Sequence, residues 1–241
     1  MEPAYVRYGG LRRGKGDKFM KLTLDLVKKN SAINVFIKQT EKYLDALGYT
    51  DHGFRHVNIV SDRARSLAKQ IGLSAKEQEL AAIAAYCHDM GNFLGRSQHH
   101  YQGAVLFSQI FMDGCDSPED ISVVMQAIVS HDKDELKLVN KVSAILILAD
   151  KSDVHRTRVK NKSLDKIKND IHDRVNYSVT QNDLELNRAK KEVSLRLKID
   201  TKITNPVEYF EIFIGRMTFC RQAAQYLGYK FVLIINNFKL S

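Results

Sequence analysis

The sequence has 241 residues, of which 44% are hydrophobic, and a formal net charge of +9. This composition is typical of a globular protein with a packed core and excludes a disordered chain. The longest apolar run, residues 144–149, is too short to span a bilayer, and three scattered cysteines are not typical of a disulfide framework. We therefore expect a cytoplasmic protein with reduced thiols, no membrane partner and anionic ligands.

A basic, glycine-rich segment opens the sequence. We expect residues 1–30 to form a basic and partly flexible arm, because runs of positive charge are usually solvated. A flexible arm or a misplaced start, with Met20 as the alternative first residue, accounts for this segment better than an RNA-binding tail does. The basic side chains in question are Arg7, Arg12, Arg13, Lys15 and Lys18.

Helices are predicted to dominate residues 31–162. Apolar residues at helical spacing predict one helix over residues 54–71 and another that begins at the capping box of Ser74 and Glu77. Ser117 followed by Pro118 is a start signal for a further helix. The run VSAILILAD, residues 142–150, predicts a buried helix that ends in an aspartate.

The pattern changes in residues 163–241, where we predict a small α+β subdomain. Strict alternation of apolar and polar residues over 193–199 predicts a half-buried strand, and similar patterns begin at Val175 and at Leu184. Asn205 and Pro206 then begin a helix that Gly228 closes, and residues 231–235 predict a last strand. We expect a mainly α protein with a small C-terminal antiparallel sheet and one packed helix.

Two aspartates lie where a negative charge is unfavourable. Asp89 and Asp150 each follow an apolar helical run, and the helix dipole disfavours a carboxylate at a C-terminus by about 0.3–1 kcal/mol. His56, His88 and His131 lie on or beside the inward faces of their helices. Each histidine alone would more often be a hydrogen-bonded core residue, but together they suggest a cation. Imidazole and carboxylate suit iron, manganese, zinc or cobalt.

The order His56, His88–Asp89, Asp150 resembles the defining pattern of the HD-domain superfamily of metal-dependent phosphohydrolases. Two further histidines, in QHHYQGA and in AIVSHD, resemble those that the dinuclear-metal branch adds between the two aspartates. LADKSD, residues 148–153, resembles the final motif of that superfamily, in which a basic residue follows the metal aspartate. The resemblance covers roughly residues 51–158.

The resemblance implies an HD-domain helical bundle that binds divalent metal ions, two in number, with iron first and manganese, zinc, cobalt or nickel as alternatives. It also implies that Asp89 bridges the ions, with His99 as a ligand of the second ion and His100 as the alternative. The implied reaction is cleavage of a phosphoester or phosphoanhydride of a small phosphorylated or nucleotide substrate by a metal-bound hydroxide. The implied metal ligands are His56, His88, Asp89, His99, His131 and Asp150.

Positive side chains near these motifs are candidates for binding the substrate. Charge spreads over the oxygens of a transferring phosphoryl group, so cations are needed beside it. We assign Arg96, Lys151 and Arg156 to substrate phosphate, and Asp89, His99 and Lys151 to catalysis. Arg158, Lys160 and Lys162 are at least as well explained as solvated charges, and Cys87 as a packing residue rather than a nucleophile.

Two other functions use the same residues. HD-type di-iron oxygenases share the ligand set, and the basic stretch after Asp150 favours hydrolysis over that chemistry. Alternatively, the metal would only stabilise the helices of a ligand- or nucleic-acid-binding protein. Nucleic acid is disfavoured as a partner, because no aromatic residues alternate with the basic residues of 190–202. The C-terminal subdomain is suited equally to a homodimer contact or to a lid over the pocket.

Overall fold

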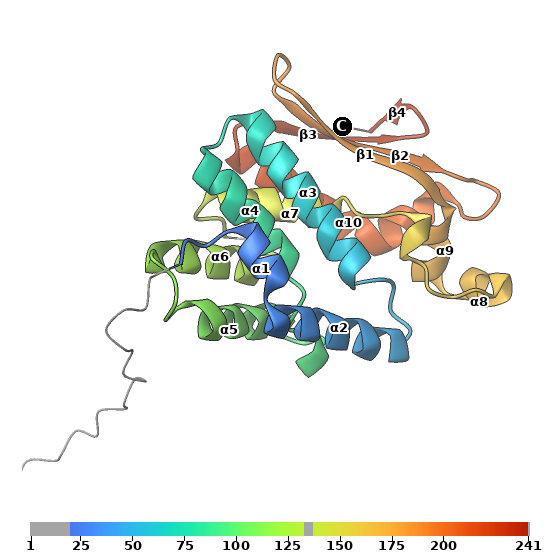
Figure 1. Ribbon diagram of the computed structural model, residues 1–241. Helices are drawn as coiled ribbons and strands as arrows, with labels where there is room; N and C mark the ends of the chain where they lie inside the picture. The colour runs from blue at the N-terminus through green and yellow to red at the C-terminus, as the bar shows by residue number, and fades with distance from the viewer. Residues whose placement is uncertain (1–19, 133–136, 241) are drawn as a thin grey trace, which may run out of the picture.

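The computed structural model describes residues 20–132 and 137–240. Helices α1–α7 form a body, and a sheet covers one side of it, with α10 beneath the sheet (Figure 1). The helices of the body are α1 (Leu24–Lys29), α2 (Ser31–Ala46), α3 (Phe54–Ile71), α4 (Ala75–Cys87), η1 (Asn92–Leu94), α5 (His99–Phe111), α6 (Pro118–Ser130) and α7 (Lys141–Lys151).

The chain then leaves the body through short helices and enters the sheet. These later elements are η2 (Arg156–Arg158), α8 (Leu164–Asn169), α9 (Ile171–Ser178), β1 (Val179–Asn187), β2 (Glu192–Ile199), α10 (Pro206–Tyr226), β3 (Lys230–Ile235) and β4 (Phe238–Lys239). The prediction of a mainly α protein with a small C-terminal sheet and a packed helix is confirmed. None of the helices in residues 20–132 and 137–240 is both long and apolar enough to cross a membrane.

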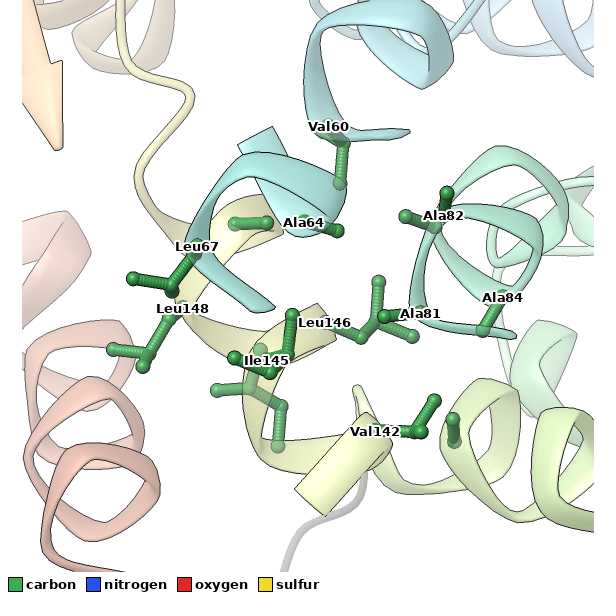
Figure 2. Packing of buried hydrophobic residues seen from close by; sticks show 14 of the residues in the cluster. Val60, Ala64, Leu67, Ala81, Ala82, Ala84, Val142, Ile145, Leu146 and Leu148 are labelled. Atoms are coloured by element: carbon green, nitrogen blue, oxygen red, sulfur yellow. The ribbon is translucent and has the colours of Figure 1, made fainter. Parts of the chain in front are cut away.

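Helix α7 is the centre of the hydrophobic core. It contacts α3, α4, α6 and α10, and every residue from Val142 to Lys151 is buried. Figure 2 shows Ile145, Leu146 and Leu148 of this helix among small residues of α3 and α4, such as Ala64 and Ala81. Small partners let the helices approach closely, and apolar contact on all sides fixes the position of Asp150 in the last turn.

Local signals set several helix ends where the sequence predicts them. Helix α3 spans the predicted range 54–71, and the capping box of Ser74 and Glu77 is present at the start of α4. Ser117 accepts a hydrogen bond from the backbone N–H of Asp120, with Pro118 in the first turn of α6. Each signal acts within four residues, so it does not depend on the tertiary fold.

The prediction of an antiparallel sheet is wrong in one pairing. The strand order is β1-β2-β3-β4, in which β1 pairs antiparallel with β2, and β3 with β4. Strands β2 and β3 pair in parallel, with Val193 opposite Phe231. Helix α10 connects these two strands and returns the chain to the same end of the sheet, so β3 must run in the direction of β2.

The strand pattern that begins at Val175 is also misread. Residues Ile171–Ser178 form α9, and β1 begins at Val179. Asp170 caps this helix by accepting a hydrogen bond from the backbone N–H of Asp173, and Val175 faces the core. Residues 171, 175 and 178 would share one face of a helix, and residues 175, 177 and 179 would equally share one face of a strand. The cap at Asp170 favours the helix.

Met20, the first described residue, forms an isolated bridge with Cys115. Leu24 and Val27 of α1 are buried, and the backbone N–H of Leu24 donates to Glu79 of α4 at 2.6 Å. The basic side chains assigned to a flexible arm, from Arg7 to Lys18, lie outside the described residues.

Candidate metal centre

Helix ends from five helices meet at one point of the body. Two of the site residues are at helix N-terminal turns and the others at or just beyond C-termini, because α3 and α5 start where α4, α6 and α7 end. Three negative and two positive dipole ends therefore face one location, so the helix dipoles give a small net preference for a cation there. The buried residues at this location are His56 on α3, His88 and Asp89 after α4, His99 on α5, His131 after α6 and Asp150 on α7.

One group of donor atoms joins α3, α4 and α7. His56 Nε2 lies 3.3 Å from His88 Nε2 and 3.4 Å from Asp150 Oδ1. Asp89 Oδ2 approaches His88 Nε2 to 3.3 Å and His56 Nε2 to 3.6 Å. These four residues are among the metal ligands that the resemblance to the HD-domain superfamily implies.

A second group joins α5 and α6 to the same aspartate. His99 Nε2 lies 3.2 Å from His131 Nε2, and Asp89 Oδ1 lies 3.3 Å from the former and 3.6 Å from the latter. The two oxygens of Asp89 thus face different groups. Asn92 fixes this orientation, because its side-chain N–H donates to Asp89 Oδ1 at 2.9 Å.

Hydrogen bonds set which ring nitrogen of each histidine is free. The Nδ1 atoms of His88, His99 and His131 contact the carbonyl oxygens three residues earlier, at 2.7, 3.0 and 2.6 Å. A carbonyl oxygen only accepts, so Nδ1 carries the hydrogen and donates it. His56 Nδ1 lies 2.7 Å from Asp153 Oδ2 and is held in the same way. All four rings therefore direct Nε2 to the centre, as metal-binding histidines do.

The donor set fits divalent metal ions. Within each group, two imidazole Nε2 atoms and the carboxylate oxygens lie 3.2–3.6 Å from one another. Their lone pairs repel one another unless a cation lies between them. Metal–ligand bonds of about 2.0–2.2 Å at tetrahedral or octahedral angles place neighbouring donors roughly 3.0–3.5 Å apart. Three groups of three described residues at this centre have donor atoms close enough together to hold a metal ion. They are His56–His88–Asp150, His88–Asp89–His131 and His99–His131–Asp132.

The charges at the centre also indicate a site for metal ions. Burial alone would lower the pKa of His88, but the carboxylates of Asp89 and Asp150 outweigh burial and raise it to about 10. Burial would raise the pKa of Asp89, yet His88, His131 and His99 hold it well below its ordinary value. The carboxylates thus attract a proton where no metal is bound, and protons compete with metal ions for these ligands.

Two of the three phosphate-binding candidates lie beside Asp132, on the side of the centre where the Arg96 and Asp132 side chains are each 34% exposed, which we call the open side. Lys151 Nζ lies 2.9 Å from Asp150 Oδ2 and 3.3 Å from Asp132 Oδ1. Arg96 lies 4.0 Å from Asp89 Oδ1 and 3.7 Å from Asp132 Oδ2. Both cations face the same region, where the half-exposed Asp132 carboxylate lies between them.

Two other predicted candidates lie elsewhere. The guanidinium of Arg156 lies over the ring of Tyr177, 5.3 Å from its centroid, and makes no hydrogen bond or ion pair with the six metal-ligand candidates. His99 directs Nε2 into the centre, whereas the His100 ring lies beside the Tyr101 ring, tilted by 44° with centroids 4.5 Å apart. The geometry thus places His99 rather than His100 beside His131.

The structure adds residues that sequence reasoning missed. Asp132 lies 3.7 Å from His99 Nε2, and Asp153 holds His56. Both have a signal in the sequence: Asp132 follows a candidate histidine directly, as Asp89 does, and Asp153 lies about one helical turn after Asp150.

Two arginines hold Asp153 in place. Arg55 pairs with Asp153 at 2.8 Å, and Arg158 donates to the backbone oxygen of Asp153 at 2.7 Å. Asp153, held by these contacts, in turn orients the metal-ligand candidate His56.

Gly91 lets the loop after Asp89 lie against α5. A Cβ atom at this position would overlap the backbone oxygen of His99 and lie 2.5 Å from the backbone nitrogen of Gly103. We expect Gly91→Ala to displace the start of α5, to lower bound metal per chain, and to cost about 1–3 kcal/mol of stability through overpacking. Elemental analysis and thermal unfolding measure both effects.

Gly215→Ala is the matched control for this substitution. Gly215 is a helical residue of α10, and nothing lies within 4 Å of an added Cβ. The control should bind metal normally and gain up to about 1 kcal/mol, because alanine favours a helix over glycine. Wild-type metal content and stability in Gly91→Ala would show that this backbone contact does not position His99.

Comparison with known proteins agrees with this geometry. Residues 53–168 match the family described as the HD domain, and this range contains all six metal-ligand candidates. The chain is also similar to an uncharacterized protein, MJ1020, of Methanocaldococcus jannaschii, with 25% identity over 214 residues that cover 80% of each chain. HD domains form a superfamily of metal-dependent hydrolases. Residues 53–168 are therefore similar to the HD domain both in sequence and in the residues that they bring to the centre.

Proposed function

We propose that the protein is a metal-dependent phosphohydrolase that cleaves a phosphoester or phosphoanhydride bond of a small phosphorylated or nucleotide substrate. The observation that carries this proposal is the position of Asp89 between two groups of donors, with Lys151 and Arg96 at the open side. Divalent ions held by these donors would polarise a phosphoryl oxygen and lower the pKa of a water ligand, so that it serves as nucleophile near neutral pH.

The residues at the open side bind and orient the phosphoryl group. Burial alone would lower the pKa of Lys151, but Asp150 and Asp132 outweigh burial and raise it, so the ammonium stays charged. A phosphoryl group that enters this side meets Lys151 and Arg96, which both lie near Asp132 in the structure. The incoming phosphate would replace the Asp132 carboxylate as the partner of these cations, because it carries more charge and more acceptor oxygens.

The basic side chains favour hydrolysis over oxygen chemistry. Cations at the open side offset charge that develops on phosphoryl oxygens, whereas cleavage of a carbon bond by O2 does not need them. The test therefore runs both assays on the same protein. Phosphate release is measured with p-nitrophenyl phosphate, nucleoside mono-, di- and triphosphates and dinucleoside polyphosphates, and oxygen uptake is measured with polyols and phosphonates.

The protein is purified without oxygen and loaded with iron(II), manganese, zinc, cobalt or nickel in turn. We expect metal-dependent phosphate release, and Lys151→Met should lower kcat/KM by about 10²–10³-fold, as the loss of a transition-state donor does. Lys141→Met, an exposed lysine at the other end of α7, is the control and should keep full activity. Metal-loaded protein that releases no phosphate from any substrate in the panel would contradict the proposal.

A further inference from the structure

Strand β1 carries a polar residue in line with two core leucines. Asn182 lies on the same face of β1 as Leu184 and Leu186, because side chains alternate along a strand, and both leucines pack against the hydrophobic core. The strand contacts α3 of the helical body (Figure 1). An amide on such a face is unfavourable unless its polar atoms have partners. The partners of Asn182 therefore indicate its role.

Asn182 binds the segment that follows α7. Its side-chain Nδ2 donates to the backbone oxygen of Ser152 and, at 3.0 Å, to the backbone oxygen of Val154. An asparagine amide has two N–H donors, so both are used here. Ser152 and Val154 are the chain neighbours of Asp153. The two hydrogen bonds thus fix the peptide groups on both sides of that aspartate.

Arg63 of α3 completes the same network from the helical body. Its guanidinium donates to Asn182 Oδ1 and, at 3.0 Å, to the hydroxyl of Ser152. The Ser152 hydroxyl donates in turn to the backbone oxygen of Ala149 at 2.7 Å. A guanidinium only donates and a carbonyl only accepts, so the amide of Asn182 fits in one orientation. Strand β1 is therefore joined to the end of the helix that carries Asp150.

Asp153 connects this network to the metal centre. Its Oδ2 atom lies 2.7 Å from His56 Nδ1, and His56 Nε2 then faces His88 and Asp150. The backbone N–H of Asp153 also donates to the backbone oxygen of Asp150 at 3.0 Å. A displacement of this segment would move the acceptor that sets the ring orientation and the tautomer of His56.

We propose that Asn182 is a positioning residue of the metal centre, which acts through Asp153 on His56. The C-terminal sheet is then neither a separate unit nor only a cover, because it completes the group of donors on α3, α4 and α7. This inference rests on the metal centre that the proposed function uses, but it does not require hydrolysis.

The group of donors on α5 and α6 is oriented by other atoms. His99 Nδ1 donates to the backbone oxygen of Arg96, and His131 Nδ1 donates to that of Ile128. The loss of the Asn182 contacts should therefore affect one group of donors and spare the other. General damage to the fold would affect both groups.

A cobalt(II) titration of the chelated protein, followed by its visible absorption, tests this selectivity. Asn182→Asp keeps the size of the side chain and an acceptor for Arg63, but it has no N–H for the two carbonyl oxygens. We expect this variant to weaken one cobalt-binding step by about tenfold, the lower end of the loss typical of contacts beyond the ligands, and to change the absorption of that step. The other step should be unchanged.

Two further variants complete the titration. Gln181→Glu makes the same amide-to-carboxylate change at an exposed neighbour on the opposite face of β1, and it should bind cobalt as the wild type does. His99→Ala removes a ligand candidate of the spared group, so the step that remains belongs to the group of His56. Asn182→Asp should weaken that remaining step.

A double-mutant cycle tests whether Asn182 acts through Asp153. Asp153→Ala removes the acceptor for His56 and should weaken the same cobalt-binding step by about 10–100-fold. In the Asp153→Ala background, Asn182→Asp should add almost nothing, because the aspartate that it positions is gone. Two losses that add in full would show that the residues act independently and would overturn the inference.

The positioning role and the hydrolase proposal fail in different ways. If the wild type binds cobalt but releases no phosphate, and Asn182→Asp weakens one step, the hydrolase proposal fails and the positioning role stands. If the wild type releases phosphate and Asn182→Asp binds cobalt normally, or weakens both steps equally, the positioning role is overturned and the hydrolase stands. Asn182→Leu, which matches Leu184 and also lacks the donors, repeats the comparison if the aspartate variant unfolds.

Discussion

Asp89→Asn should remove the ion from one of the two groups of donors and lower phosphate release by about 10³-fold. The two oxygens of Asp89 face different groups, at 3.3 Å from His88 Nε2 and 3.3 Å from His99 Nε2. An asparagine has the same shape but offers one oxygen, so it can serve one group and presents an N–H to the other. Metal per chain, measured by mass spectrometry of the elements, and phosphate release report the effect.

Asp62→Asn provides the control for the loss of a carboxylate. Asp62 is exposed on α3, the helix that carries His56, and it makes no ion pair within the described residues. This variant should keep wild-type metal content and activity. Retention of both ions in Asp89→Asn would contradict a bridging position for Asp89, whatever the effect on activity.

Removal of metal should destabilise the whole helical body. The candidate ligands come from α3, α5, α7 and the ends of α4 and α6, so an ion links elements that are distant in sequence. Without metal, the buried carboxylates of Asp89 and Asp150 lose their main counter-charge. Metal at a thousand times its dissociation constant contributes about 4 kcal/mol. For a chain of this size such a loss lowers Tm by roughly 8–16 °C.

Differential scanning calorimetry of protein dialysed against a chelator measures this shift, and the original Tm should return when metal is added. Asp89→Asn should show a much smaller response to metal in the same experiment, because its ligands no longer assemble. If the chelator removes the metal and Tm does not change, the helical body is stable without the ions and this prediction is contradicted.

Features that depend on a few neighbouring residues could be predicted from the sequence. The capping box of Ser74 and Glu77 and the Pro118 start signal act locally, and both are present in the structure. The positions of Asp89 and Asp150 after apolar helical runs indicated a cation, because a carboxylate at a helix C-terminus is unfavourable. The full set of six candidate ligands followed from the resemblance to the HD-domain superfamily. The hydrogen-bond partners and tautomers of the candidate histidines depend on backbone carbonyls that packing brings close, and residue spacing does not predict these contacts.

Features that depend on tertiary contacts could not be predicted in this way. Val175 fits a strand or a helix, and the choice is made by the cap at Asp170 and by burial of one face. The parallel pairing of β2 with β3 depends on where α10 packs.

The connection from β2 through α10 to β3 also sets an order in biosynthesis. The ribosome releases all six candidate ligands before it releases α10, because Asp150 precedes Pro206 in the chain. The nascent helical body can thus take up its ions while the central strand β3 is still untranslated, since domains fold as units during synthesis. Helix α10, which packs against the α7 helix that carries Asp150, then joins a helical body whose candidate ligands have already been synthesised.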